Sequence, residues 1–278
     1  MLRSILVALD DTPGAHAARD MAFALARRHG AALTAAVVLD HPHTNREHEP
    51  VPIGGAAFKA RRDAALSARA DTEAAAAFTA CAAASGETPY FELRLPDAPE
   101  PALLRAGATH DLIVIGRDST LGLEALDDGV APVIEALLHE GARPLLVVPE
   151  QAPAKADGPI LVGYDGSIPV MAALQLFALM GLAEGAPVRV ASAAATREEA
   201  IALAEEGCVY LRHHGIAATP LAMLGDRPAD LLLAQAEALG VRMMVLGAFE
   251  ESGLRRRFLG SATHVLLREA RVPVFIHR

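Results

Sequence analysis

The sequence predicts an α/β protein built from two tandem, doubly wound domains, each with a five-stranded parallel sheet. Continuous apolar runs of strand length alternate with longer, often Ala-rich stretches along the whole chain. A strand followed by an acid occurs twice, and so does one pair of glycines at a fixed spacing. Apolar runs without polar alternation are typical of parallel strands that are buried on both faces.

The repeat is clearest where a strand ends in an aspartate. The apolar run at 4–9 leads into Asp10, and the similar run at 159–164 leads into Asp165. Turn-forming residues follow both aspartates. Each aspartate is therefore expected at the carboxyl end of the first strand of a domain.

A pair of glycines marks the later part of each copy. Gly116 and Gly247 each end an apolar run, and a second glycine follows thirteen residues on, at Gly129 and Gly260. Because both copies keep this spacing, we expect the same strand, loop and helix in both domains.

Strands and helices alternate within each copy. In the first copy, strands are expected at 4–9, 32–39, 90–95, 111–115 and 144–148, and helices at 15–29, 60–85, 101–108 and 130–140. In the second copy, strands are expected at 159–164, 187–193, 218–224, 241–246 and 273–277, and helices at 169–183, 196–214, 228–239 and 261–270. Strands separated by helices in this way imply a parallel sheet with right-handed crossovers.

The expected domains span residues 1–150 and 158–278, and they differ in length mainly at one place. The first copy carries a His- and Pro-rich insert at 41–57. Imidazole is a common metal ligand, but no carboxylate or thiolate at ligand spacing completes a site in this insert. No metal site is therefore predicted.

The composition argues against several classes of function. Of the 278 residues, 52% are hydrophobic, which is ample for a core, whereas only 4% are aromatic and the formal net charge is −9. Proteins that bind single-stranded nucleic acid stack bases on aromatic rings and follow phosphates with basic grooves, so nucleic acid is not an expected partner. The Gly-Lys-Ser/Thr phosphate loop and the G-x-G-x-x-G dinucleotide fingerprint are also missing.

The sequence favours a cytoplasmic protein. Its apolar runs are too short or too interrupted to cross a bilayer, so a membrane is not an expected partner, and the N-terminal run is too short for a signal peptide. Cys81 and Cys208 do not form a C-x-x-C pair, and both fall late in Ala-rich stretches. We expect them to be reduced thiols buried in the core.

The two aspartates and the glycines that end strands are the candidate site residues. In an open parallel sheet, ligands bind beyond the carboxyl ends of the strands, where the strand order reverses. We therefore expect Asp165 to lie beside Gly247, and Asp10 beside Gly116. A carboxylate there accepts hydrogen bonds from ribose hydroxyls, and a loop that runs into a helix offers N–H groups to phosphate. An isolated Asp-Gly-Ser favours the simpler alternative of a tight turn that caps a helix, and only its combination with the glycine spacing favours a nucleotide role.

In the second copy, the aspartate, both glycines and the Ser261 after them resemble the nucleotide motif of the universal stress protein family, G-x2-G-x9-G-(S/T). The resemblance covers essentially the whole chain as two family domains, which implies a Rossmann-like fold of the adenine nucleotide alpha hydrolase-like type. It also implies that the second domain binds ATP, accompanied by Mg²⁺. The implied site comprises Gly163, Asp165, Gly247, Arg255, Gly260, Ser261 and Thr263. The chain departs from the motif at Glu250, whose carboxylate would oppose a triphosphate.

The first copy is the poorer nucleotide site. It keeps Asp10, Gly116 and Gly129, but Ser119 stands at the second motif glycine and Val130 at the Ser/Thr position. The first 150 residues carry 13 Lys/Arg and 21 Asp/Glu, a net charge of −8, whereas the rest of the chain carries −1. Phosphate anions are therefore expected to prefer the second half.

The resemblance implies a stress-response protein that binds ATP in its second domain and so changes its association with an unidentified protein partner. No pairing of nucleophile and general base is visible, so we expect no catalysis beyond slow ATP hydrolysis. The resemblance further implies an intramolecular pseudo-dimer through strands 144–148 and 273–277, and a homodimer of such chains. The alternative hypothesis is a nucleotide-free dimeric interaction scaffold in which both sites are degenerate.

Overall fold

The computed structural model describes residues 1–41, 55–121, 130–151, 157–248 and 261–278. The strands of the first domain are β1 (Ser4–Leu9), β2 (Ala32–Val38), β3 (Tyr90–Leu95), β4 (Leu112–Gly116) and β5 (Leu145–Val148). Its helices are α1 (Pro13–His29), α3 (Ala56–Ser85), α4 (Pro99–Gly107) and α5 (Pro132–Glu140). Helix α3 begins inside the expected insert, because Ala56 and Ala57 are good helix formers that extend the Ala-rich run.

The second domain repeats this alternation. Its strands are β6 (Ile160–Gly163), β7 (Val188–Ala194), β8 (Ala218–Leu224), β9 (Met243–Gly247) and β10 (Val274–His277). Its helices are α6 (Ile168–Met180), α7 (Arg197–His213), α8 (Pro228–Leu239) and α9 (Ser261–Glu269). Each of these elements lies within a few residues of its expected position.

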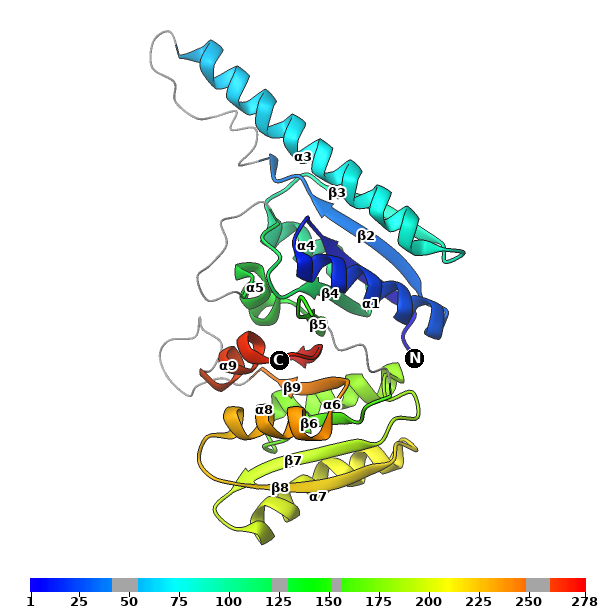
Figure 1. Ribbon diagram of the computed structural model, residues 1–278, viewed down its shortest axis with the longest axis vertical. Coiled ribbons are helices and arrows are strands. Elements are labelled where there is room, and N and C mark those ends of the chain that lie inside the picture. Colours follow the sequence, from blue (N-terminus) through cyan, green and yellow to red (C-terminus); the bar gives the residue numbers. More distant parts are fainter. Residues whose placement is uncertain (42–54, 122–129, 152–156, 249–260) are drawn as a thin grey trace.

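The strands of the described residues form one ten-stranded sheet in the order β3-β2-β1-β4-β5-β10-β9-β6-β7-β8. Neighbouring strands within each half run parallel. Figure 1 shows the two halves following each other along the long axis, with helices packed against the sheet. The predicted doubly wound α/β fold is confirmed.

Local sequence signals explain where the first helix of each domain begins. Thr12 Oγ1 accepts a hydrogen bond from Ala15 N in α1, and Ser167 Oγ accepts one from Val170 N in α6. A proline in the first turn of both helices supports the start, because its fixed φ suits the helix and its missing N–H costs nothing there. The turn between the first strand and the first helix is therefore short and well defined in both domains.

Two apolar layers hold the helices on the sheet. One layer lies under α1, α3, α6 and α7 and includes the fully buried Phe23 and Phe177. The other lies under α4, α5, α8 and α9 and includes Leu103 and Leu232. Because few aromatic residues are available, Ala, Val, Leu and Ile fill most of both layers, as the composition predicts.

The two domains meet at the centre of the sheet, where β5 and β10 pair antiparallel with Leu146 opposite Phe275. The pairing through the last strands that the family resemblance implied is therefore present within one chain. Charged groups add to the junction, since Arg28 pairs with Glu184 and His29 Nε2 lies 2.9 Å from Glu184 Oε1.

Both cysteines are free and buried, on α3 and α7, as expected from their Ala-rich surroundings. Burial raises the pKa of the Cys81 and Cys208 thiols to about 11. Among the helices of the described segments, none has both the length and the apolar character needed to cross a membrane.

Candidate functional site

Each domain has a crevice where the strand order reverses. In the first domain β2 and β4 lie on opposite sides of β1, and in the second domain β7 and β9 lie on opposite sides of β6. Asp10 follows β1 and Asp165 follows β6, so both aspartates lie at the carboxyl ends of the strands beside these reversals. The predicted neighbourhood of the first and fourth strands is confirmed in both domains.

Contacts within the chain occupy the Asp10 carboxylate. Its Oδ1 accepts hydrogen bonds from Thr12 N at 3.0 Å and from Thr12 Oγ1 at 2.7 Å. Its Oδ2 accepts one from Leu121 N at 2.9 Å, which draws the segment after β4 onto the end of β1. Asp10 therefore joins the turn before α1 to the segment after β4 without any ligand.

A second carboxylate lies against the N-terminus of α1. Asp118 Oδ2 accepts a hydrogen bond from Gly14 N at 3.3 Å, and a Cβ at Gly14 would lie only 1.9 Å from Asp118 Oδ1. The N-terminal end of a helix attracts anions, so the Asp118 carboxylate lies where an anionic ligand group would be favourable. Asp118 Oδ1 and the fully buried Ser119 Oγ have no hydrogen-bond partner among the described residues.

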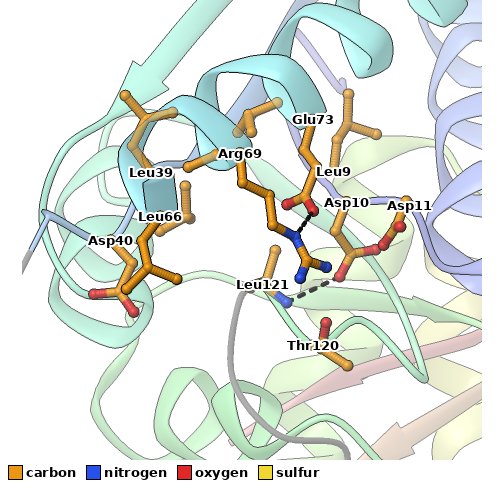
Figure 2. Close-up of a pocket in the computed structure, with 13 residues that line it drawn as sticks. Leu9, Asp10, Asp11, Leu39, Asp40, Leu66, Arg69, Glu73, Thr120 and Leu121 are labelled. Atoms are coloured by element: carbon orange, nitrogen blue, oxygen red, sulfur yellow. Dashed lines mark hydrogen bonds and ion pairs between the residues drawn. The ribbon is translucent and has the colours of Figure 1, made fainter. Parts of the chain in front are cut away.

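A cavity of about 290 Å³ opens beside Asp10. Figure 2 shows the Arg69 side chain reaching from α3 into this cavity, with its Nε 2.7 Å from Glu73 Oε1. The lining residues are Leu9, Asp10, Asp11, Val37, Val38, Leu39, Asp40, Leu66, Arg69, Ala70, Glu73, Thr120 and Leu121. Four of these carry carboxylates and one carries a guanidinium, and Glu73 raises the pKa of Arg69 above its usual value. The cavity is therefore unfavourable for phosphate.

The corresponding aspartate of the second domain is more accessible. Asp165 is exposed, and its Oδ1 accepts a hydrogen bond from Ser167 N at 2.9 Å. The preceding Tyr164 is buried, and its hydroxyl lies 3.4 Å from Glu206 Oε2. Burial, together with the Glu206 carboxylate, raises the pKa of that phenol. Within the described residues, no carboxylate binds the N-terminus of α6 in the way that Asp118 binds α1.

The glycines that end the fourth strands permit close helix packing. A Cβ at Gly116 would lie 2.4 Å from Ala15 N, and a Cβ at Gly247 would lie 2.4 Å from Val170 N. A Cβ at Gly163 would lie 2.8 Å from Leu232 Cδ1 of α8, which is the end of a flexible side chain and can move. Packing against backbone therefore explains Gly116 and Gly247, whether or not a ligand binds nearby.

Two of the remaining predicted site residues belong to the first turn of α9. Ser261 is the first residue of this helix, and Thr263 is fully buried in its first turn. Gly129, Arg255 and Gly260 lie outside the described residues, and so does Glu250. Their assignment to the site stays a prediction.

Comparison with known proteins decides the family. A model of the universal stress protein family matches residues 1–149 and matches again at residues 158–278. This chain belongs to the universal stress protein family. Its two matches show a tandem arrangement of two universal stress protein domains. No curated protein matches the chain.

Solved structures of similar fold cover nearly the whole chain. A universal stress protein from Archaeoglobus fulgidus DSM 4304 has 15% identity and a TM-score of 0.69, and the match covers 99% of this chain and 98% of that one. A putative universal stress protein from Pseudomonas aeruginosa UCBPP-PA14 has 16% identity and a TM-score of 0.59, with coverage of 99% and 93%. At such identities the likeness concerns the fold of this tandem universal stress protein.

Three residues around the first crevice of this universal stress protein were not predicted from the sequence, namely Arg69, Asp118 and Leu121. Asp118 stands two residues after Gly116 and its acidity was visible in the sequence, but its contact with Gly14 spans 104 positions. Arg69 lies on the Ala-rich helix α3, whose sequence gives no sign that this side chain lines a cavity. The described residues contain no group of three or more His, Cys, Asp or Glu side chains that could hold a metal ion.

Proposed function

We propose that this chain is a cytoplasmic stress-response protein that binds adenine nucleotide in its second domain and thereby alters its association with a protein partner. The difference between the two aspartates carries the proposal. Asp10 accepts three hydrogen bonds from its own chain, whereas Asp165 is exposed and accepts one from the described residues. Among the described residues, Asp165 Oδ2 accepts no hydrogen bond, and a carboxylate oxygen at an exposed position suits ribose hydroxyls.

Charge supports the same choice of domain. The first half carries a net charge of −8 and its cavity is rich in carboxylates, while the second half carries −1. A nucleotide phosphate is therefore repelled less by the second domain. In that domain, α9 begins at Ser261, and a helix N-terminus with a hydroxyl suits phosphate.

The residues present suit binding better than turnover. Asp165 would accept hydrogen bonds from the ribose, Ser261 and Thr263 belong to the helix turn that would face phosphate, and Arg255 would add positive charge. Mg²⁺ would accompany ATP and neutralise part of its charge. No nucleophile with an adjacent general base is found among the described residues of this crevice, so we propose at most slow ATP hydrolysis.

The test is ATP binding to the full chain, measured by calorimetric titration and by thermal shift. Asp165→Asn should weaken ATP binding about tenfold or more, because it replaces a charged acceptor with a neutral one of the same shape. The matched variant Asp10→Asn should leave ATP affinity unchanged. Equal losses in both variants would contradict the choice of domain.

Nucleotide carried through purification gives an independent result. We expect denaturation of the purified protein to release adenine nucleotide that can be identified by chromatography. If none is released and ATP at millimolar concentration gives no thermal shift, the nucleotide proposal fails. The alternative of a nucleotide-free interaction scaffold would then stand.

A further inference from the structure

The sheet formed by the described strands has two outer edges, β3 and β8. An outer strand presents unpaired N–H and C=O groups, and it can pair with a strand of another molecule unless the edge is blocked. The two edges of this protein differ in this respect. The comparison between them indicates which edge is available for pairing.

The β8 edge contains a proline whose backbone faces away from β7. Val188 N donates to Ala217 O, so the backbone of Ala217 and of alternate residues after it faces β7. Pro220, which pairs with Val190, therefore has its backbone on the outer side, where it offers no N–H. A proline at the middle of an edge strand prevents regular pairing with another strand.

The β3 edge has no such block. Leu39 N donates to Leu95 O, so Leu95 and the alternate residues Leu93 and Phe91 turn their backbones toward β2. Glu92 and Arg94 therefore present their N–H and C=O groups outward. Both side chains are exposed, and no proline lies within the strand.

The charges on this edge complement a second copy of the same strand, and within the chain Arg94 Nη1 also lies 3.3 Å from Asp71 Oδ1 of α3 and its guanidinium lies over the Phe78 ring. In an antiparallel pair centred on Leu93, Glu92 of one copy lies opposite Arg94 of the other, and the reverse pair forms by symmetry. The same two residues carry the outward N–H and C=O groups, so the hydrogen bonds and the opposite charges fall in one register. If the pairing were centred on residue 92 or residue 94 instead, two Glu92 or two Arg94 side chains would lie opposite each other. Like charges directly opposite each other are destabilising.

The other face of β3 offers apolar surface to the same pairing. Phe91 is 68% exposed, whereas Leu93 and Leu95 are only partly buried against the layer under α4. In the register centred on Leu93, Phe91 lies opposite Leu95 of the second copy and diagonal to its Leu93. Pairing therefore covers an exposed aromatic ring with apolar side chains.

We propose that β3 is a self-association edge, through which two copies of this chain form a two-fold dimer in the register centred on Leu93. The partner is a second copy of this chain, because the charge pattern is complementary to itself. This proposal is independent of nucleotide binding in the second domain. It also gives a definite surface to the homodimer that the family resemblance implied.

The test is the mass of the full chain in solution, measured by sedimentation equilibrium. We expect the unmodified chain to be dimeric at micromolar concentration. Glu92→Arg should place Arg opposite Arg twice, and Arg94→Glu should place Glu opposite Glu twice. Each change should weaken the dimer about tenfold or more, because two attractive pairs become repulsive. A monomeric unmodified chain, or single variants that dimerise as well as it does, would overturn the proposal.

Two combinations separate this register from nonspecific charge effects. The doubly exchanged variant, Glu92→Arg with Arg94→Glu, should regain the dimer. A mixture of the two single variants should form a heterodimer, because every Arg then faces a Glu. Leu224→Arg, at an exposed position of β8 whose backbone also faces away from β7, is the matched control and should leave the dimer unchanged. Failure of both the double variant and the mixture to associate would overturn the register.

Discussion

Gly247 is the last residue of β9, and it packs against the first turn of α6. Its replacement by alanine tests whether the backbones of β9 and α6 must approach this closely. The new Cβ would lie 2.4 Å from Val170 N, 2.7 Å from Val170 Cα and 2.8 Å from the carbonyl carbon of Pro169. The shortest of these distances falls about 1 Å below an ordinary van der Waals contact. All three neighbours are backbone atoms, so no side chain can rotate away.

The expected cost follows from this geometry. Overpacking of a core costs about 1–3 kcal/mol, and we expect Gly247→Ala near the upper end, about 3 kcal/mol, because the helix itself must move. For a chain of this size, a loss of about 3 kcal/mol lowers the melting temperature by roughly 6–12 °C. Circular dichroism during heating, together with urea unfolding, measures the change.

A matched control separates packing from backbone preference. Gly240→Ala introduces a methyl group at φ 58 with nothing within 4 Å, so its cost is confined to the left-handed backbone, about 1–2 kcal/mol. The reasoning is refuted if Gly247→Ala loses no more stability than Gly240→Ala. In that event packing would not account for Gly247.

Two further predictions concern the cores and the junction of the domains. Burial raises the pKa of Cys81 and Cys208 to about 11, so neither thiol is ionised near neutral pH. A thiol reagent should therefore label both cysteines only after denaturation. Labelling of the native protein at the rate of an exposed cysteine would contradict this prediction. Arg117 Nη1 donates to Arg268 O and Ala270 O at the end of α9, each at 2.8 Å, so Arg117→Ala should cost about 1–2 kcal/mol in urea unfolding. Arg227→Ala removes only an exposed ion pair and should cost less than about 1 kcal/mol.

Much of the fold was predictable because its signals are local. The apolar runs that end at Asp10 and Asp165 identify buried strands, and the turns after them identify helix starts. The repeated glycine spacing identified two copies of one domain. Boundaries were less accurate, as at α3, because the Ala-rich run has no strong start signal and Gly55 makes no side-chain cap.

The position of the candidate site was predictable from the sequence, but the hydrogen bonds that its two aspartates accept were not. The strand order places Asp10 and Asp165 at equivalent crevices, yet the two carboxylates differ in what they bind. The contact of Asp10 with Leu121 spans 111 positions, so no local pattern could reveal it. The same holds for Asp118, whose carboxylate accepts a hydrogen bond from Gly14 N at the start of α1 across 104 positions.

The sequence by itself determined the alternation of strands and helices, the two domains, and the strand ends at which a ligand would bind, because periodicity and turn residues act over a few positions. The tertiary structure decided how many hydrogen bonds each aspartate accepts from the described residues, where a cavity lies, and which backbone groups of β3 face away from β2. Those properties depend on groups that meet only after the chain has folded. Glu92 and Arg94 illustrate this, because their charges were visible in the sequence but the outward direction of their backbone groups required the pairing of β3 with β2.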